Sequence, residues 1–248
     1  MGKLFINRKL FALSETESTN TYASSLPDDT PEGSVVWALS QSRGRGQGEN
    51  NWESESGKNL LLSIVLNPLF VEPAQQFYIS KAVSLAVADL ISLYTDNVSV
   101  KWPNDIYVGD KKIAGILIEN SLERDFIKQS VVGIGVNINQ INFKGNAPNP
   151  VSLKQLTGQE FYLEEELDTL CELLEYRYDL LKNNQLEIID ETYFELLYRK
   201  NKTATYRANG KTFRGTITGV GTTGQLHITD ETGNEHKFWH KEVEFVIE

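Results

Sequence analysis

The chain has 248 residues, a formal net charge of −10 at pH 7, and 40% hydrophobic and 10% aromatic residues. This size fits one large domain, or one domain with a small appendage, and the apolar content suffices for a folded core. The acidic balance excludes a general nucleic-acid binder, because neutralising phosphates requires a basic face. Fewer than twenty residues precede the first motif, at Ser18, which leaves no room for a helix-turn-helix module. We therefore expect no DNA binding.

The sequence shows no sign of secretion or of a membrane span. Its longest apolar runs, such as LLLSIVL at 60–66, are far too short to cross a bilayer, and no secretory signal opens the chain. A single cysteine, Cys171, excludes an internal disulfide and a cysteine-based zinc cluster. We therefore expect a cytoplasmic protein with no membrane partner.

The first part of the chain alternates between predicted helices and strands. Apolar residues at helical spacing predict helices over 18–26, over 73–94 and along a leucine stripe from 163 to 181. Cys171 falls on that stripe, so we expect it to be a small core residue. Short apolar or β-branched runs predict strands at 35–39, 59–66, 98–102, 105–108, 112–119 and 130–139.

After about residue 200, short β-rich runs alternate with tight turns, which predicts a small all-β barrel. We expect a main domain at 1–200 and the barrel at 201–248. The expected fold class is α+β, with a mixed, mainly antiparallel sheet that carries helices on one face, followed by the barrel. The motif GVGTTG at 219–224 matches G-x-G-x-x-G, but a strand follows it instead of a helix, so it predicts a hairpin turn.

All three histidines, His227, His236 and His240, lie in the predicted barrel. The main domain has none, so we expect no histidine base at a site in that domain. The alternative interpretation of the three histidines is that they bind a zinc ion in the barrel. No G-x-x-x-x-G-K-[ST] motif occurs, so any use of ATP is not of the P-loop kind.

The segment KWPNDIYVGDKKIAGILIE, at 101–119, is the most informative stretch. Pro103 fixes its own backbone and favours an extended residue before it, so the chain bends out of a strand here. Asn104 and Asp105 then lie at the bend. Asp105 either binds a divalent cation beside phosphates, because hard cations take oxygen ligands, or is an ordinary turn residue bonded to its own backbone.

Two adjacent lysines, Lys111 and Lys112, follow a turn signal in the same segment. Only one of two adjacent strand residues faces inward. Gly115 removes a side chain where another group must approach closely. We interpret Lys112 as a lysine aimed at a carboxylate or a phosphate, and a solvated lysine at a strand end is the alternative.

The polar loop SRGRGQGENNW, at 42–52, combines glycines, arginines and a tryptophan. Its glycines allow positive φ, so consecutive N–H groups can converge on an anion. Arg45 adds a forked donor suited to carboxylate or phosphate, and Trp52 offers a flat face for stacking. A disordered surface loop is the alternative interpretation.

Taken together, these stretches resemble the biotin protein ligases, also called biotin–[carboxylase] ligases. STN at 18–20, QSRGRGQGENNW at 41–52, the segment at 101–119 and GIGVNIN at 133–139 match that family's motifs in order. The terminal barrel also fits, as a barrel of the Src-homology type. The resemblance spans essentially the whole chain and implies the monofunctional class, without a DNA-binding domain.

The resemblance also implies roles for particular residues. Lys112 would bridge the biotin carboxylate and the ATP α-phosphate, Asp105 would lie near the phosphates and Mg²⁺, and Arg45 would help close the loop. The implied catalytic residues are Lys112, Arg45 and Asp105, with Asp105 as the metal ligand. The implied biotin-binding residues are Ser18, Thr19, Asn20, Gln41, Gly44, Arg45, Gly46, Gln47, Lys112 and Gly115. The implied ATP-binding residues are Trp52, Lys101, Asn104, Asp105 and Asn137, with Trp52 and Asn137 at the adenine.

The implied reaction uses ATP and Mg²⁺ to convert biotin to biotinyl-AMP, and then transfers biotin to a lysine of the biotin carboxyl carrier domain of a carboxylase. Both reacting partners are anions, so the site must supply positive charge, which Arg45, Lys112 and Mg²⁺ can do. The attacking carboxylate is already ionised at neutral pH, so it needs no histidine base. The resemblance allows a homodimer paired edge to edge through a core strand, and no local pattern decides for or against it.

The loop departs from the commoner family pattern, which reads roughly G-R-G-R-R-G-R. Gln47 stands where a second arginine is usual, Asn50 replaces another, and Glu49 carries a charge that opposes anion binding. These changes predict a looser hold on biotinyl-AMP. Two other functions stay open, a lipoate or octanoate ligase or transferase, and a non-enzymatic biotin sensor. The segment KWPNDIYV and the arginine loop favour biotin, and the intact Lys112 favours an enzyme.

Overall fold

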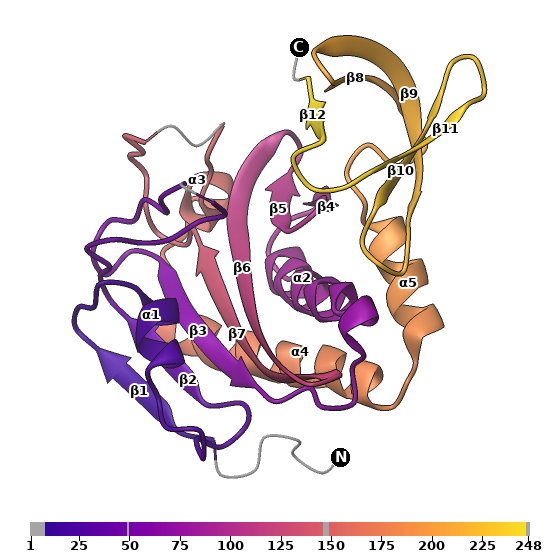
Figure 1. The fold of residues 1–248 in the computed structure, drawn as a ribbon. Coiled ribbons are helices and arrows are strands. Elements are labelled where there is room, and N and C mark those ends of the chain that lie inside the picture. Colours follow the sequence, from indigo (N-terminus) through magenta and orange to yellow (C-terminus); the bar gives the residue numbers. More distant parts are fainter. Residues whose placement is uncertain (1–7, 49, 146–148, 247–248) are drawn as a thin grey trace.

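A computed structural model describes residues 8–48, 50–145 and 149–246 (Figure 1). Its large sheet has seven strands in the order β1-β2-β3-β7-β6-β5-β4. β1 and β2 run parallel, and every other neighbouring pair is antiparallel. The strands are β1 (Leu10–Leu13), β2 (Val35–Ala38), β3 (Leu60–Leu66), β4 (Val98–Lys101), β5 (Asp105–Val108), β6 (Lys111–Glu123) and β7 (Phe126–Val136).

The longer helices cover one face of this sheet. The main core joins side chains of β3, such as Leu62 and Ile64, to those of α2 (Phe77–Ser92) and α4 (Leu163–Lys182). The 3₁₀ turn η1 (Pro73–Gln75) precedes α2, and α5 (Leu186–Glu195) packs against α2 and α4. The expected α+β class with a mainly antiparallel sheet is confirmed, and the longer helices lie on one face as expected. The short α1 (Thr19–Ser24) packs on the opposite face.

A second sheet forms the C-terminal part, in the order β11-β10-β9-β8-β12, with all neighbours antiparallel. In Figure 1 this small sheet stands beyond the β4–β5 edge of the large sheet. GVGTTG forms the turn between two of its strands, as predicted. The strands are β8 (Thr203–Ala208), β9 (Lys211–Val220), β10 (Leu226–Asp230), β11 (Glu235–Phe238) and β12 (Val243–Phe245).

Hydrogen bonds connect the β4–β5 edge to the segment that leads into the small sheet and to the small sheet itself. The Val100 N–H donates to the Leu196 carbonyl at 2.8 Å, and the Tyr198 N–H donates to the Val100 carbonyl at 2.9 Å. The indole N–H of Trp102 donates to the carbonyl of Gly224, in the GVGTTG turn, at 2.9 Å. The Trp102–Gly224 bond crosses residue 200, and the domain boundary proposed there remains a prediction.

Some element boundaries differ from the sequence prediction. The helix expected over 73–94 begins as a 3₁₀ turn, and its α-helical part covers Phe77–Ser92. β6 extends past the run predicted at 112–119, and β7 begins before the run predicted at 130–139 and ends within it, at Val136. The hairpin is longer at its turn because polar residues such as Ser121 and Gln129 also pair across it. β1, α3 (Leu153–Thr157) and α5 were not predicted. None of the helices in the described ranges is long and apolar enough to cross a membrane.

Candidate functional site

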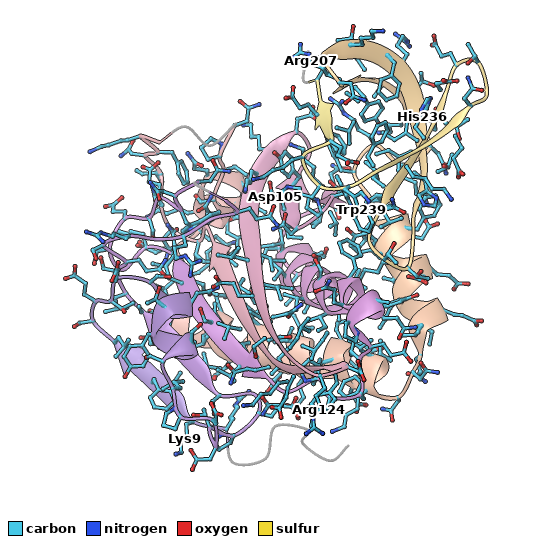
Figure 2. All side chains as sticks on the ribbon, in the orientation of Figure 1. Lys9, Asp105, Arg124, Arg207, His236 and Trp239 are labelled. Carbon is cyan, nitrogen blue, oxygen red and sulfur yellow. The ribbon has the colours of Figure 1, made fainter. Side chains whose placement is uncertain are left out.

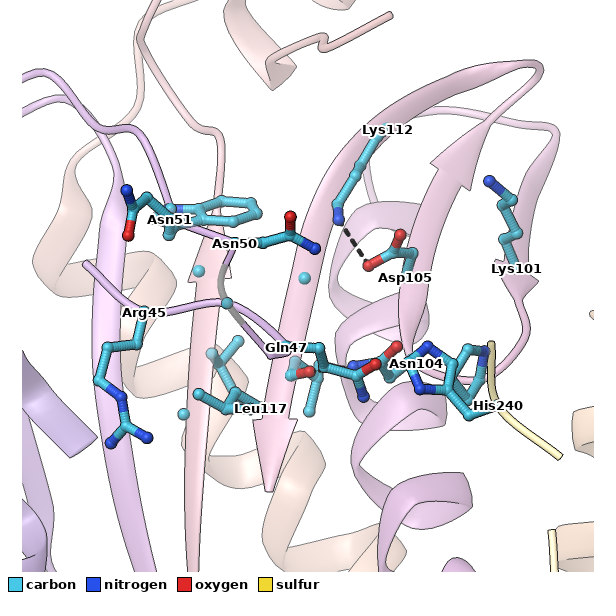
Figure 3. Close-up of a pocket in the computed structure, with 18 of the residues that line it drawn as sticks. Arg45, Gln47, Asn50, Asn51, Lys101, Asn104, Asp105, Lys112, Leu117 and His240 are labelled. Carbon is cyan, nitrogen blue, oxygen red and sulfur yellow. Dashed lines mark hydrogen bonds and ion pairs between the residues drawn. The ribbon is translucent and has the colours of Figure 1, made fainter. Parts of the chain in front are cut away.

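One cavity of about 540 Å³ opens where the large sheet meets the turn between β11 and β12 (Figure 3). This volume falls in the range of small-molecule sites, about 300–1,000 Å³. Its walls come from the start of α1, the loop 41–52, the β4–β5 turn, strands β6 and β7, and residues 240–245. The predicted site residues that line it are Ser18, Thr19, Asn20, Gln41, Arg45, Gly46, Gln47, Trp52, Lys101, Asn104, Asp105, Lys112 and Gly115.

The start of α1 forms a buried polar recess at the cavity wall, and Thr19 and Asn20 are only 4% and 3% exposed. The Thr19 N–H and hydroxyl donate to Gln41 Oε1 at 2.7 and 3.1 Å. The Ser63 hydroxyl donates to Asn20 Oδ1 at 2.6 Å, and Asn20 Nδ2 donates to Glu119 Oε2 at 2.9 Å. Polar groups held in this way present fixed donors and acceptors, which suits a ligand with a polar head.

Glycines on β6 and β7 allow other groups to pack directly on the sheet, as predicted from Gly115 and the two glycines of GIGVNIN. A β-carbon on Gly133 would lie 2.1 Å from Asn20 Oδ1, and one on Gly135 would lie 2.4 Å from the Trp52 indole. A β-carbon on Gly115 would lie 2.9 Å from the same indole. The buried indole N–H of Trp52 has no hydrogen-bond partner among the described residues.

Lys112 and Asp105 form an ion pair inside the cavity (Figure 3). Lys112 Nζ lies 2.6 Å from Asp105 Oδ1, and the two side chains are 19% and 25% exposed. The backbone of Lys112 is fixed as well, since its N–H donates to the Asn149 carbonyl and its carbonyl accepts from the Val151 N–H, both at 2.9 Å. Lys112 thus lines the cavity while its neighbour Lys111 is exposed, as strand alternation predicts.

The cavity is rich in positive charge. Lys101 Nζ donates to the Tyr107 hydroxyl at 3.1 Å. Burial lowers the pKa of Lys101 from its ordinary value, and the nearby Asp105 carboxylate opposes that shift. In a chain whose net charge is −10, this concentration of cations suits an anionic ligand. Four cationic side chains line the cavity beside two carboxylates: Arg45, Lys101, Lys112 and Lys241, with Asp105 and Glu244.

Arg45 is engaged with a carboxylate that the sequence prediction missed. Arg45 Nη2 lies 2.6 Å from Glu119 Oε1, and Nη1 lies 3.0 Å from Glu119 Oε2, which is a bidentate pair. Figure 3 shows the guanidinium pointing away from the Lys112–Asp105 pair. The charge of Arg45 is therefore available to an anion only after this pair opens. The signal for Glu119 was a lone carboxylate at the end of the otherwise apolar run KIAGILIE.

Glycine is needed at Gly44 in the 41–52 loop because neighbouring atoms pack closely against it, and positive φ angles are less common among the loop glycines than the sequence suggested. Only Gly48 has a positive φ, at 64°, while Gly44 and Gly46 do not. A β-carbon on Gly44 would lie 2.5 Å from the Trp52 carbonyl oxygen. The Gly46 N–H donates to the Asn50 carbonyl at 2.7 Å, and the Trp52 N–H donates to the Gly44 carbonyl at 2.9 Å. These bonds fold the loop back on itself, and Gly44 is not among the lining residues of the cavity.

Asn137, predicted at the adenine, does not line the cavity either. β7 ends at Val136, and the Asn137 N–H turns to donate to the Ile113 carbonyl at 2.9 Å. Asn137 Nδ2 donates to the Val151 carbonyl at 3.1 Å, while its buried Oδ1 has no partner among the described residues. Glu49, expected to oppose anion binding, lies outside the described residues.

Asn104 ties the β4–β5 turn to β6. Its side-chain amide donates to the Ile116 carbonyl, and the Ile116 N–H donates to the Asn104 carbonyl at 3.1 Å. The predicted bend at Pro103 is present, with β4 ending at Lys101 and β5 beginning at Asp105. The Trp102–Pro103 peptide is cis. Asn104 therefore fixes the position of Asp105 relative to β6.

A histidine reaches the cavity from the small sheet. His240, in the turn between β11 and β12, lines the cavity, and its ring centroid is 6.1 Å from that of Trp102. Burial lowers the pKa of His240, the neighbouring Lys241 adds to this effect, and Asp105 opposes it. The sequence placed all three histidines in the predicted barrel, and it did not show that the turn carrying His240 docks at the cavity. No group of three or more His, Cys, Asp or Glu that could hold a metal occurs among the described residues.

The fold and the cavity together define an α+β protein that can hold a small molecule with a polar head beside a cluster of cations. Residues 13–137 match the model of the biotin/lipoate A/B protein ligase family. The chain therefore belongs to this family, and the resemblance drawn from its motifs is confirmed.

Relatives and solved structures agree with that assignment. The bifunctional ligase/repressor BirA of Bacillus subtilis is 35% identical over 116 residues, which cover 46% of this chain and 35% of that protein. The biotin--[acetyl-CoA-carboxylase] ligase of Paracoccus denitrificans is 33% identical over 168 residues, which cover 64% of this chain and 68% of that protein. The chain spans only 35% to 48% of the BirA proteins of Bacillus subtilis and Escherichia coli.

A solved structure shows the same fold. The biotin protein ligase from Aquifex aeolicus in complex with biotin and ATP matches with a TM-score of 0.81 and 23% identity, covering 96% of this chain and 99% of that one. The likeness extends over the small C-terminal sheet as well as the large one.

Proposed function

We propose that this chain activates biotin with ATP as biotinyl-AMP and transfers the biotin to a specific lysine of a biotin carboxyl carrier protein. The supporting observation is that one cavity joins the buried polar recess of α1 to the Lys112–Asp105 pair. The name of the Paracoccus relative and the biotin and ATP of the Aquifex complex agree with this chemistry.

The recess at α1 favours biotin over lipoate. The ureido ring of biotin carries two N–H donors and a carbonyl acceptor, which the buried groups of Thr19, Asn20 and Gln41 can pair with. The dithiolane ring of lipoate has no such groups, so it would leave buried polar atoms unpaired. Unpaired buried donors and acceptors cost about 1–3 kcal/mol each, which is enough to discriminate between the two acids.

In the first reaction a biotin carboxylate oxygen attacks the α-phosphorus of ATP. The new P–O bond forms as the bond to pyrophosphate breaks, so negative charge gathers around the α-phosphate. Lys112 supplies a fixed positive charge at this point, and preorganised charge of this kind is usually the largest single contribution to catalysis. Arg45 adds a second charge when its pair with Glu119 opens. Trp52 offers its ring to the adenine.

The residues at the cavity also fit Mg²⁺ brought by the nucleotide. Mg²⁺ usually keeps several waters and takes one or two carboxylates together with substrate phosphates, so it needs no cage made by protein alone. Asp105 is the carboxylate that would hold it, and Mg²⁺ bound there would neutralise phosphate charge. Asp105 would then exchange its pair with Lys112, which frees the lysine for the biotin carboxylate.

In the second reaction the ε-amine of a carrier lysine attacks the acyl carbon of biotinyl-AMP. The C–N bond forms, the bond from the acyl carbon to the phosphate oxygen breaks, and AMP leaves as the amine loses a proton. Lys112 can stabilise the negative charge on the departing AMP phosphate. Several described residues of the loop 41–52 line the cavity, where they can shield the reactive anhydride from water.

Incubation with ATP, Mg²⁺, biotin and a carrier domain tests the proposal. We expect biotin-dependent exchange of pyrophosphate into ATP, followed by biotin on the carrier lysine. Transfer of lipoate or octanoate alone would support the lipoate-type alternative. Tight binding of biotin without exchange would support a sensor.

A further inference from the structure

The second reaction needs a group that takes a proton from the attacking amine. A lysine amine is protonated at neutral pH because its ordinary pKa lies far above 7, so it must become a free base before it attacks. Its nitrogen then loses a further proton as the C–N bond forms. The two carboxylates at the cavity are both engaged in ion pairs, Asp105 with Lys112 and Glu244 with Arg207. The question is which other group at the cavity accepts this proton.

A second cavity, of about 370 Å³, adjoins the first. Its walls come from the start of α2, the β4–β5 turn, β6, and residues 223–224 and 239–240 of the small sheet. Figure 3 shows the His240 ring beside Asn104, on the side of the first cavity opposite Arg45. The residues that line both cavities are Gln47, Trp102, Pro103, Asn104, Ile116 and His240. His240 therefore lies where the two cavities meet.

Among the described residues that line the second cavity, His240 is the only titratable one. The other lining side chains are neutral and polar, such as Gln76, or apolar, such as Phe77 and Ile118. These surroundings offer no carboxylate to hold an ammonium group, and burial favours the neutral form of an amine. A lysine amine that enters from this side is therefore favoured as the free base that the reaction requires.

The position of His240 is supported by the packing around it. Its ring lies edge-on to Trp102, with 6.1 Å between ring centroids and 65° between ring planes. Trp102 is only 4% exposed, and its indole N–H donates to the Gly224 carbonyl at 2.9 Å. Figure 2 shows Asp105 and Trp239, the residue before His240, in the region where the two sheets meet. The imidazole is thus placed near the Lys112–Asp105 pair by contacts that join the two sheets.

The charges around His240 favour a neutral imidazole. Burial is the main cause that lowers the pKa of His240 from its ordinary value of 6.5, Lys241 lowers this pKa further, and Asp105 opposes the shift. The other charged side chains that line the first cavity are Arg45, Lys101, Lys112 and Glu244. Three of these four are cations, which also disfavour imidazolium. At neutral pH the ring therefore has a free lone pair that can accept a proton.

We propose that His240 is the proton acceptor of the second reaction and takes the proton of the carrier lysine as its amine attacks biotinyl-AMP. This inference rests on the proposed function. The amine nitrogen bonds to the acyl carbon, the bond from that carbon to the phosphate oxygen breaks, and AMP leaves with the electron pair. The proton passes from the nitrogen to the imidazole and then to water. The first reaction needs no such transfer, because the biotin carboxylate attacks as an anion.

The test measures the two reactions separately in wild type and His240→Gln. Protein loaded with biotinyl-AMP is mixed with the carrier domain, and transfer of biotin is followed in a single turnover. Glutamine is similar in size and polarity but cannot take up the proton, so we expect transfer to slow by about 100-fold or more. Biotin-dependent exchange of pyrophosphate into ATP reports the first reaction and should proceed as in wild type.

Two further measurements separate proton transfer from a structural role. Wild-type transfer should fall as pH drops through the pKa of His240, because imidazolium has no free lone pair, and this inflection should be missing in His240→Gln. Added imidazole should restore transfer in His240→Ala, because it can reach the space left at this exposed position. The matched control is His227→Gln, which changes a histidine of the small sheet outside both cavities and should leave both reactions unchanged.

Three results would overturn the inference. The first is normal single-turnover transfer in His240→Gln. The second is an equal loss of transfer and of pyrophosphate exchange, which would show that His240 supports the cavity as a whole. The third is an unchanged pH profile in His240→Gln together with no rescue of His240→Ala by imidazole. Failure of the proposed function gives a different result, since wild type itself would then show no biotin-dependent pyrophosphate exchange.

Discussion

Replacing Lys112 with alanine separates catalysis from stability at this site. The change removes the ammonium group that lies 2.6 Å from Asp105 Oδ1 and leaves that carboxylate without its partner. The Asp105 side chain remains 25% exposed, so water can solvate the unpaired charge. The Lys112–Asp105 pair is intermediate in burial. Losing an exposed ion pair costs about 0–1 kcal/mol, and breaking a fully buried one costs about 3–5 kcal/mol.

We therefore expect Lys112→Ala to lower the free energy of unfolding by about 1–2 kcal/mol. For a chain of this length each kcal/mol lowers Tm by about 2–4 °C. The catalytic loss should be much larger. Removing a preorganised group that stabilises transition-state charge costs about 10²–10³ in kcat, or about 2.7–4 kcal/mol.

Biotin-dependent pyrophosphate exchange measures the catalytic loss, and thermal unfolding of the same preparations measures the loss of stability. Lys111→Ala is the matched control, because this neighbour is exposed and outside the cavity. It should change neither quantity. Near-normal exchange in Lys112→Ala would refute the role given to this lysine, and loss of folding would show that the pair is mainly structural.

Three other predictions follow from the same structure. Arg45→Ala should weaken the binding of biotin and of biotinyl-AMP, measured by calorimetry, by about 10-fold each, because a charge-assisted contact is lost. Unchanged binding of both ligands together with slower transfer of biotin to the carrier would contradict this. Gln47→Arg should slow the release of biotinyl-AMP by about 10-fold, and an unchanged release rate would sink the idea that this loop holds the adenylate loosely. Burial raises the pKa of Glu166, so its ionisation destabilises the fold at neutral pH, and this cost disappears as pH falls below the ordinary carboxyl range. Glu166→Gln keeps an acceptor for the Tyr94 hydroxyl, and it should raise Tm by a few degrees at pH 7 and by less at pH 4.

The sequence was informative wherever function required a particular residue type in a local pattern. The bend at Pro103, the inward position of Lys112 and the close approach at Gly115 all follow from backbone geometry that a few neighbouring residues determine. The apolar stripe of α4, including Cys171, follows from helical periodicity. These predictions succeeded because their causes act over a few residues along the chain.

The glycines in the sequence predicted where another group approaches the backbone closely, but they did not predict which group it is. From the sequence, the glycines of GIGVNIN predicted a close approach by an unnamed group. The structure shows that Gly133 makes room for Asn20, from α1, and Gly135 for Trp52, from the loop. Those partners lie far apart in sequence, so only the pairing of β3, β7 and β6 brings them together.

By itself, the sequence determined the fold class, the family and about half of the residues that line the cavity, because each depends on motifs whose spacing is local. Only the tertiary structure decided which of those residues are already paired, as Arg45 is with Glu119, and which come from the far end of the chain, as His240 and Lys241 do. The physical reason is that ion pairs and cavity walls depend on distances in space. Those distances are set by how the small sheet docks on the β4–β5 edge, through contacts such as Trp102 with Gly224, which no local pattern encodes.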